Sequence, residues 1–586
     1  MPSTMPSPRT TTVLSLLAAA VSVTAASVSN SSVRWTACAD NMGSPLPVDC
    51  ARMTVPLDYT EPARGGLELE LLRVPAVTQP AQGSILLNFG GPGQPGRQNL
   101  ALVSAVLQAL SGGRFNLVAF DPRGTVNTLP FTCYDPVFWQ QNFWQDPIFP
   151  VRDDPRGPET ELGRLWARGS ALADVCARKH NDTGRLISTA FVVRDLVRVA
   201  EALDDDGLVR YWGFSYGTTL GATLLSMFPD KVDKVILDGV QNAHDYYNAD
   251  ADFEEWTQSD EVFSGIFTSC AANPDRCALA RPGKSAADLE QSVWKLADSL
   301  RRRPLAFNTS SFVLDDGTLR GFMSESLYST SSWPDAMAVM NMLISGPVDE
   351  AFVLRHLGDR ASLLPDSNSS AIETAMTRTL VATMPLFGIH CLDRTVRKGS
   401  LDALMPALRR LLSISRVMGG AGVNSAVVCA QWKLEPRERY AGDFRVRPRA
   451  PVLIVGNSHD GHTPIRSAHN LSAGVEGSVV LEVDGYGHTS LGLPSRCMIR
   501  TLSAYWRDGK MPAPGTVCGV DAPPFSGITW PDILNSSSSI TNTTTTTTTT
   551  TTNSSSSTAG RQRGPVKRHA ETWRGAEVPT RSWRLL

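Results

Sequence analysis

The sequence predicts an α/β protein with a mostly parallel central sheet, and three observations support this fold class. Apolar strand-like runs alternate with helical patterns through the first 240 residues. Most of these runs are apolar at every position, which is typical of parallel strands covered by helices on both faces. Strand-like runs resume at residues 451–456 and 478–483, after a long helical stretch. The predicted architecture is therefore a sheet with a large, mainly helical cap inserted before its last strands.

The elements follow one another in a regular order. Residues 51–59 and 67–74 are predicted strands, the second because apolar and polar side chains alternate along it. Further strands are predicted at residues 84–89, 115–120, 234–237 and in the short run before Gly213, and helices at 99–110, 189–203 and 219–227. Residues 241–449 contain Trp-rich and Met-rich helical segments without an evident buried strand. We expect them to lie over the carboxyl ends of the strands, where such folds bind ligands; a separate domain is disfavoured because the strands on both sides need each other.

Five regions follow from this pattern. Residues 1–26 are a predicted secretory signal, with Arg9, an apolar run and a small-residue cleavage site. The first part of the core is expected at 35–240, the cap at 241–449 and the second part of the core at 450–520. Residues 535–586 form a Ser/Thr-rich and then basic tail, which lacks the apolar residues needed to fold and is expected to be disordered.

Composition excludes two classes of partner. The chain has 586 residues and a net charge of −2, so it has no broad basic field for nucleic acid. No stretch is long and apolar enough to span a membrane. The signal instead predicts a secreted, extracellular protein.

The cysteines and sequons agree with export. Ten cysteines occur singly, without metal-like Cys-x-x-Cys pairs, which favours disulfides. The sequence does not fix their connectivity, but neighbours in order make plausible loops: Cys38–Cys50, Cys133–Cys176, Cys270–Cys277, Cys391–Cys429 and Cys497–Cys518. N-glycans are expected at Asn-x-Ser/Thr sequons, which begin at Asn30, Asn181, Asn308, Asn368, Asn470, Asn535, Asn542 and Asn553.

The strongest functional motif is Gly213-x-Ser215-x-Gly217, between a strand-like run and a helical pattern. A sharp strand-to-helix turn exposes the serine hydroxyl in a strained conformation. The two glycines are needed because a Cβ there would collide with the neighbouring strand and helix. The motif predicts a nucleophilic serine.

A serine nucleophile needs a base that is oriented by a carboxylate. In proteins with this type of turn, the serine comes first in the chain, the acid second and the histidine third. Asp460 is the only carboxylate just after the resumed strand, and His488 follows the next strand in a glycine turn. The predicted triad is Ser215, Asp460 and His488. Asp238 and Asp484 are rival acids.

A tetrahedral intermediate also needs two N–H donors. One is expected from Tyr216, the residue after the nucleophile. The other is expected from Gly91, in the glycine-rich loop 90–93, where bare backbone can approach a carbonyl group.

Two competing motifs are weaker. Gly91-x-Gly93-x-x-Gly96 with Asp121 ending the next strand has the form of a dinucleotide fingerprint. Two prolines in that loop remove N–H groups that a pyrophosphate would use. His459, His462 and His469 form a histidine-rich segment but lack a metal-site spacing. We therefore predict no metal and no cofactor.

These motifs together resemble the tripeptidyl aminopeptidase and prolyl aminopeptidase branch of the α/β-hydrolase serine peptidases, including a TAP-like C-terminal domain. The matching stretches are ARMTVPLDY, NFGGPG, FDPRG, YWGFSYGTTLG, VILDGV, VDGYGH, GTVC and the Asp460-x-x-Thr463-Pro464 turn. The resemblance implies an α/β-hydrolase fold and an exopeptidase that acts on free N-termini through an acyl-enzyme. The chain departs from the pattern at Phe89 and at Gly461-His462, which replaces a proline and an aliphatic residue.

An aminopeptidase also needs carboxylates to hold the substrate's ammonium group, and Glu254 and Glu255, with Asp252, are the candidates. The leading hypothesis is a secreted serine aminopeptidase. The alternative is an esterase or other acyl hydrolase acting on a small molecule such as a natural product, because caps change the chemistry of this fold. A catalytically inactive binding protein is disfavoured because every triad position is filled.

Overall fold

The structure, a computed structural model, describes residues 33–135, 158–308, 310, 312–357 and 383–540. Its central element is a ten-stranded sheet with the order β1-β2-β3-β5-β4-β6-β7-β10-β11-β12. The strands are β1 (Thr36–Ala37), β2 (Asp49–Pro56), β3 (Gly66–Val74), β4 (Ser84–Asn88), β5 (Asn116–Phe120), β6 (Val209–Phe214), β7 (Val232–Asp238), β10 (Val452–His459), β11 (Val479–Tyr486) and β12 (Val517–Gly519). From β5 to β12 all neighbours are parallel, whereas β1, β2 and β3 form an antiparallel edge. The predicted fold class is confirmed.

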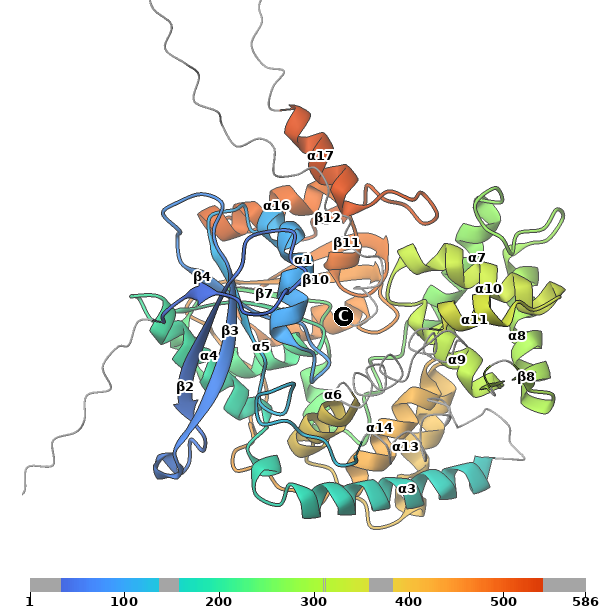
Figure 1. Ribbon diagram of the computed structural model, residues 1–586, viewed down its shortest axis with the longest axis horizontal. Coiled ribbons are helices and arrows are strands. Elements are labelled where there is room, and N and C mark those ends of the chain that lie inside the picture. The colour runs from blue at the N-terminus through green and yellow to red at the C-terminus, as the bar shows by residue number, and fades with distance from the viewer. Residues whose placement is uncertain (1–32, 136–157, 309, 311, 358–382, 541–586) are drawn as a thin grey trace, which may run out of the picture. The chain divides into compact units, whose positions relative to one another are not determined.

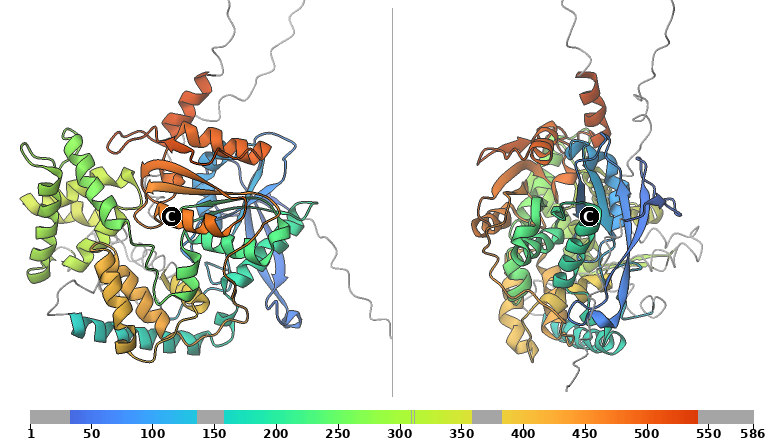
Figure 2. Two further views of the ribbon diagram at one scale, coloured as in Figure 1. Left: turned by 180° about the vertical axis from the view of Figure 1, so that it is seen from behind. Right: turned by 90° about the vertical axis from the view of Figure 1, so that its left-hand side faces the viewer.

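Helices cover both faces of this sheet (Figure 1). One face packs on α1 (Gly96–Leu110) and α16 (Arg496–Asp508), and the other on α4 (Thr189–Leu203), α5 (Tyr216–Met227) and α15 (Ile465–Gly474). Because strand side chains alternate, Tyr211 and Trp212 of β6 are fully buried in opposite layers. The layers can also be followed from behind and from the side (Figure 2).

A mainly helical segment separates β7 from β10. Its elements include α6 (Ala243–Asn248), α7 (Ser259–Ala272), α8 (Ala286–Arg302), β8 (Leu305–Phe307), β9 (Phe312–Leu314), α9 (Asp316–Glu325), α10 (Trp333–Ser345), α11 (Glu350–His356), α13 (Leu401–Ile414) and α14 (Gly419–Ala430). Helices α7 to α11 enclose one hydrophobic core, and α13 and α14 belong to a second. The short β8–β9 hairpin was not predicted, since three-residue strands carry too few residues to show a pattern.

Helix α3 (Pro158–Lys179) lies earlier in the chain but packs against α13 and α14. Leu162 and Leu165 are buried with Leu404 and Leu408 of α13. This stretch lies within residues 35–240, the range predicted for the first part of the core. The structure shows instead that part of it extends the cap.

The C-terminal part differs from expectation at one point. Helix α17 (Trp530–Ile540) runs into the segment predicted to be a disordered tail from residue 535. Trp530 and Ile533 are buried, and the indole N–H of Trp530 donates to the carbonyl of Leu491 at 2.6 Å. These apolar anchors hold the helix, so the predicted boundary was too early. The rest of the tail and the predicted signal lie outside the described residues.

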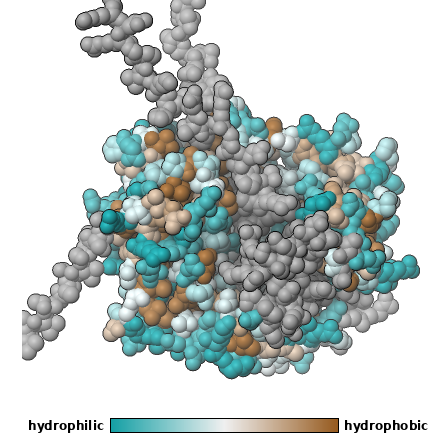
Figure 3. Space-filling view, in the orientation of Figure 1, coloured by the Kyte–Doolittle hydropathy of each residue, from teal (hydrophilic) through white to brown (hydrophobic). Residues whose placement is uncertain are grey.

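All ten cysteines form disulfides, and the five pairs are the neighbours in order that the sequence made plausible without fixing their connectivity. Among the described residues, no helix is both long and apolar enough to cross a membrane. Large exposed hydrophobic side chains come from separate elements, and hydrophobic residues are interspersed with hydrophilic ones on the face drawn in Figure 3. These side chains are Val77, Val313, Ile344, Val517 and Ile528.

Candidate active site

Ser215 lies at the turn between β6 and α5 with φ 56° and ψ −125°, a conformation that L-residues rarely adopt. Its N–H donates to the carbonyl of Asp238 at the end of β7, at 3.0 Å. A Cβ on Gly213 would lie 2.2 Å from the carbonyl oxygen of Gly217, and one on Gly217 would lie 2.7 Å from that of Asn88. Both glycines of the motif are therefore required by close backbone packing.

Asp460 and His488 come together from the ends of two adjacent strands, β10 and β11. Nδ1 of His488 lies 3.1 Å from Oδ1 and 3.0 Å from Oδ2 of Asp460, and both side chains are buried. Burial alone would raise the pKa of Asp460. The neighbouring His488 and the hydrogen bonds from His488 and Thr463 outweigh it and hold the pKa of Asp460 below its usual value. The pair is thus an ionised carboxylate that orients an imidazole.

Four further donors hold the Asp460 carboxylate. Oδ1 accepts from the N–H groups of His462 and Thr463, both at 2.8 Å. Oδ2 accepts from the Thr463 hydroxyl at 2.7 Å and from the N–H of Thr489 at 3.2 Å. The Asp460-x-x-Thr463 turn was evident in the sequence, but this role of Thr463 was not predicted.

Asp238 connects the serine turn to the histidine loop. Its carbonyl accepts from Ser215, and its carboxylate accepts from the N–H of Ser490 at 2.8 Å and from the Ser490 hydroxyl. Ser490 is two residues after His488. Ser215 and the loop that carries His488 are therefore both anchored at the end of β7. Burial raises the pKa of Asp238 to about 6.

Neither rival acid contacts the imidazole ring. The Asp238 carboxylate is used by Ser490, and Asp484 is exposed on β11. Asp460 alone of the three is hydrogen-bonded to His488.

The glycine-rich loop lies directly against Ser215. A Cβ on Gly90, whose φ is +85°, would lie 2.8 Å from the Cβ of Ser215 and 3.1 Å from the backbone nitrogen of Tyr216. The N–H of Gly90 donates to Oδ1 of Asn88, so it is not available to a substrate. Among the described residues, nothing accepts from the N–H of Gly91 or of Tyr216. These two predicted donors therefore remain free for an oxyanion.

The dinucleotide interpretation of the same loop is not supported. Asp121 accepts hydrogen bonds from the N–H groups of Gly96 and Arg97 at the start of α1. Those donors are the ones that a pyrophosphate would need. A Cβ on Gly93 would lie 2.6 Å from Pro385, which shows that a cap segment already lies against the loop.

The three histidines near the acid lie in different surroundings. His459 stacks on Tyr486 with ring centroids 4.3 Å apart, His462 is buried beside His488, and His469 is exposed. Within the described part of the chain, no group of three or more His, Cys, Asp or Glu side chains is arranged to hold a metal ion.

Glu254 and Glu255 face different partners. The carboxylate of Glu254 accepts from Asn242 at 3.1 Å, Ser467 at 2.7 Å and Asn470 at 2.6 Å. These bonds fasten the start of the cap to α15. The two glutamates are alike in the sequence, but in the structure Glu254 bonds residues of α15 and Glu255 does not.

Glu255 is half-buried and lies near the buried charges of Asp252 and Arg394. Arg394 donates to Asp252 at 2.7 Å, and Nε2 of His390 lies 3.5 Å from the same carboxylate. Arg394 and His390 hold the pKa of Asp252 below its usual value against the effect of burial. Burial and the neighbouring Asp252 raise the pKa of Glu255 well above its usual range.

Glu255 is linked to the serine turn by three hydrogen bonds. The side chain of Gln241 bonds Glu255. The N–H of Gln241 donates to the hydroxyl of Thr218 at 3.0 Å, and that hydroxyl donates to the carbonyl of Ser215 at 2.6 Å. In the described residues, no Lys, Arg or His forms an ion pair with Glu255 within 4.0 Å.

His462 adds a second imidazole next to the acid–histidine pair. Its ring lies 3.8 Å from that of Tyr328 and 5.2 Å from that of His488, measured between centroids. Its Nε2 is buried and has no partner among the described residues. Burial and the adjacent His488 lower the pKa of His462 to about 3, so the imidazole of His462 is neutral at neutral pH.

Replacing His462 with valine is expected to reduce the sensitivity of folding to acid. The folded-state pKa of about 3 lies below the unfolded value of 6.5, so the unfolded chain binds more protons between these pH values. The free energy of unfolding therefore falls as the pH drops below 6.5, by about 2 kcal/mol at pH 5 from this group. Chemical denaturation of His462→Val at pH 7.5 and pH 5 should show that much less loss. An unchanged difference between the two pH values would contradict the assignment of His462 as a buried neutral group.

Comparisons with known proteins agree with this fold and site. A family model described as the alpha/beta hydrolase fold matches residues 83–262, and one described as TAP-like protein matches residues 415–518. The first match includes Ser215, and the second includes Asp460 and His488. The chain is therefore an enzyme of the α/β-hydrolase class, a serine hydrolase.

Its curated relatives include proteins named as an aminopeptidase, a serine protease and a carboxylesterase. A tripeptidyl aminopeptidase from Streptomyces lividans is 26% identical, over 86% of this chain and 89% of the relative. The serine protease Hip1 from Mycobacterium tuberculosis is 26% identical over 83% and 91%. Carboxylesterase B from the same organism is 25% identical over 80% and 86%. The predicted resemblance to tripeptidyl aminopeptidases is confirmed.

Proposed function

We propose that this protein is an exported serine aminopeptidase that releases short peptides or single residues from free N-termini. In the proposed reaction the Ser215 hydroxyl attacks the scissile carbonyl while His488 takes its proton through Nε2. His488 then gives that proton to the leaving amine, and water hydrolyses the acyl-enzyme by the same two steps. Asp460 keeps Nδ1 of His488 protonated and stabilises the imidazolium.

The oxyanion of each tetrahedral intermediate is proposed to accept from the N–H groups of Gly91 and Tyr216. Tyr216 begins α5, so the positive end of the helix dipole points to the same place. One such donor contributes about 3 kcal/mol to transition-state stabilisation.

The observation that carries the aminopeptidase proposal is the carboxylate of Glu255. Asp252 already has Arg394 and His390 as cationic or donating partners, whereas Glu255 has a raised pKa and no ion pair among the described residues. A substrate ammonium group would supply the missing positive charge. The hydrogen bonds through Gln241 and Thr218 connect this carboxylate to the serine turn. An aminopeptidase needs such a fixed position of the ammonium-binding group relative to the nucleophile, because it cleaves at a set distance from the N-terminus.

Three features support export: the disulfides, the predicted signal and the exposed sequons. Five disulfides are typical of an oxidising compartment. The predicted signal at residues 1–26 agrees with this. Among the sequons in the described residues, Asn181, Asn308, Asn470 and Asn535 are exposed, so N-glycosylation at these sites is part of the proposal.

Replacing Glu255 with glutamine is expected to raise KM for peptides with a free N-terminus. The loss of one charge-assisted contact corresponds to about 10- to 100-fold in kcat/KM. The measurement uses a tripeptidyl-aminomethylcoumarin with a free N-terminus, its acetylated form, and an aryl acetate. The acetate should be hydrolysed equally well by wild type and Glu255→Gln.

Glu254→Gln is the matched control, since it removes a neighbouring carboxylate that serves α15. It should leave the preference for a free N-terminus intact. The alternative function, an ester or small-molecule acyl hydrolase, predicts efficient aryl ester hydrolysis and no discrimination between free and acetylated peptides. That second pattern in the wild-type protein would overturn the aminopeptidase proposal.

A further inference from the structure

A buried carboxyl group from the cap, that of Asp393, has no part in the proposed reaction. It is fully buried and accepts from the N–H of Thr189 at 3.0 Å and from the Thr189 hydroxyl at 2.5 Å. It also accepts from the hydroxyl of Tyr246 at 3.1 Å. Thr189 begins α4, and Tyr246 lies in α6, so one carboxylate collects donors from two helices.

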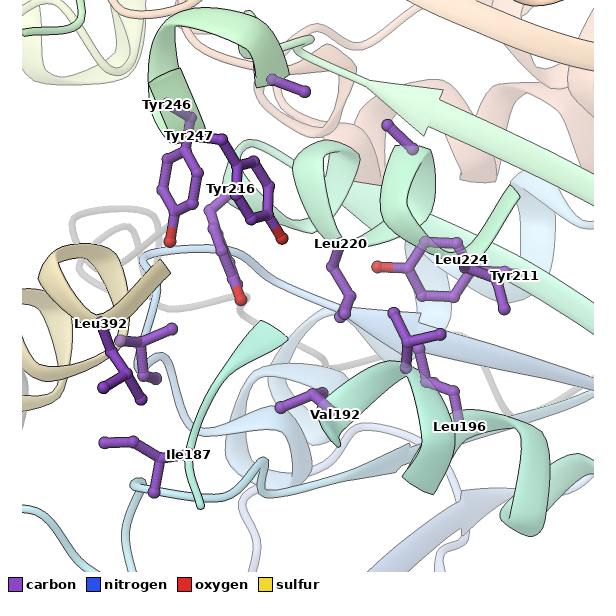
Figure 4. Close-up of a cluster of buried hydrophobic side chains, with 14 of the residues drawn as sticks. Ile187, Val192, Leu196, Tyr211, Tyr216, Leu220, Leu224, Tyr246, Tyr247 and Leu392 are labelled. Carbon is purple, nitrogen blue, oxygen red and sulfur yellow. The ribbon is translucent and has the colours of Figure 1, made fainter. Parts of the chain in front are cut away.

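The same network reaches the residue that follows the nucleophile. The hydroxyl oxygens of Tyr216 and Thr189 lie 2.5 Å apart. Figure 4 shows the rings of Tyr216, Tyr246 and Tyr247 gathered on the side of the cluster where Leu392 lies, the residue before Asp393. All three tyrosines are buried, so their hydroxyl groups depend on protein partners.

The chemistry of the groups sets the direction of these hydrogen bonds. Thr189 has one hydroxyl proton, and an ionised carboxylate can only accept, so that proton goes to Asp393. The Thr189 oxygen is then left to accept from Tyr216. Burial raises the pKa of Tyr216 well above its usual value, which keeps its hydroxyl a donor. The chain therefore runs from Tyr216 through Thr189 to Asp393.

We propose that Asp393 is a positioning residue for the oxyanion hole. Through Thr189 it fixes the Tyr216 hydroxyl and, with it, the first residue of α5, whose backbone N–H faces the substrate carbonyl in the proposed reaction. The cap thereby helps to hold a donor that lies in the core. This inference rests on the proposed role of the Tyr216 N–H.

The groups that face Asp393 define the conditions for a test. They are the hydroxyls of Tyr216, Tyr246 and Tyr247 and the more distant guanidinium of Arg439. Burial raises the pKa of Asp393 to about 7, against the effect of its donors and Arg439. At pH 8 the carboxyl group is mostly ionised, so kinetics are best compared there.

The experiment compares three variants with the wild-type protein at pH 8. Thr189→Val and Tyr216→Phe each remove one hydroxyl of the chain and leave every backbone N–H in place, whereas Thr189→Ser keeps the hydroxyl. We expect the first two to lower kcat per titrated active site about 10-fold or more with KM within twofold, because full loss of such a donor costs about 10²- to 10³-fold. Thr189→Ser should retain wild-type kcat.

A fluorophosphonate titration counts the active sites, so partial misfolding does not lower the measured kcat. A peptidyl boronic acid, which presents a tetrahedral oxygen to the same donors, should lose affinity by the same factor as kcat. If kcat per site and boronate affinity in Thr189→Val and Tyr216→Phe stay within twofold of Thr189→Ser, Asp393 has only a structural role. The proposed function would survive that result, because it is tested separately by the substrates and by Glu255→Gln.

Discussion

Ser215→Ala is expected to lower kcat/KM for every substrate by about 10⁵-fold or more while the fold is retained. The hydroxyl that would form the acyl-enzyme is lost, and neither Asp460 nor His488 can replace it. Alanine is expected to fit the site because the unusual backbone angles at Ser215 are stabilised by the hydrogen bond from its N–H to the carbonyl of Asp238. That bond does not involve the side chain. The measurement is steady-state hydrolysis together with circular dichroism.

Ser226→Ala is the matched control for this variant. Ser226 lies in α5, the helix that follows Ser215, and its hydroxyl has no hydrogen-bond partner among the described residues. Its replacement should leave kcat/KM within twofold of wild type. Substantial turnover by Ser215→Ala, measured on protein free of contaminating hydrolases, would contradict the account.

Asp460→Asn is expected to lower kcat by about 10⁴-fold. The asparagine oxygen would take the position of Oδ1, where the backbone N–H groups of His462 and Thr463 need an acceptor. Its NH₂ group would then face Nδ1 of His488 and favour the tautomer that carries the proton on Nε2. In that tautomer His488 cannot take the proton of Ser215.

The exposed Asp484 provides the control for this change. Asp484→Asn removes one carboxylate from the neighbouring strand without touching His488, and it should leave kcat unchanged. If Asp460→Asn kept more than about a tenth of wild-type kcat, another group would have to orient His488. Asp238 would be the first to test, because it is buried near the histidine loop.

Much of the fold was predictable because its signals are local. The buried strands are continuous apolar runs, and the helix predicted at residues 189–203 has the bounds of α4. Gly213 and Gly217 predict the serine turn because backbone contacts exclude a Cβ at both positions. The order of serine, acid and histidine then follows from the order of the strands.

What the sequence did not predict depends on which way a side chain points or on contacts between distant segments. Glu254 and Glu255 are adjacent and chemically alike, yet one bonds α15 and the other Gln241. Helix α3 has an amphipathic pattern that does not say whether it packs on the sheet or the cap. Asp393 was not among the predicted site residues, since its partner Thr189 lies about 200 residues away in the chain.

The most direct test of the central claim is to react the wild-type protein with a fluorophosphonate and to map the modified residue by peptide mass spectrometry. The account predicts one adduct, on the peptide that contains Ser215, and much slower labelling in His488→Ala. Labelling of a different serine that coincides with the loss of activity would contradict it.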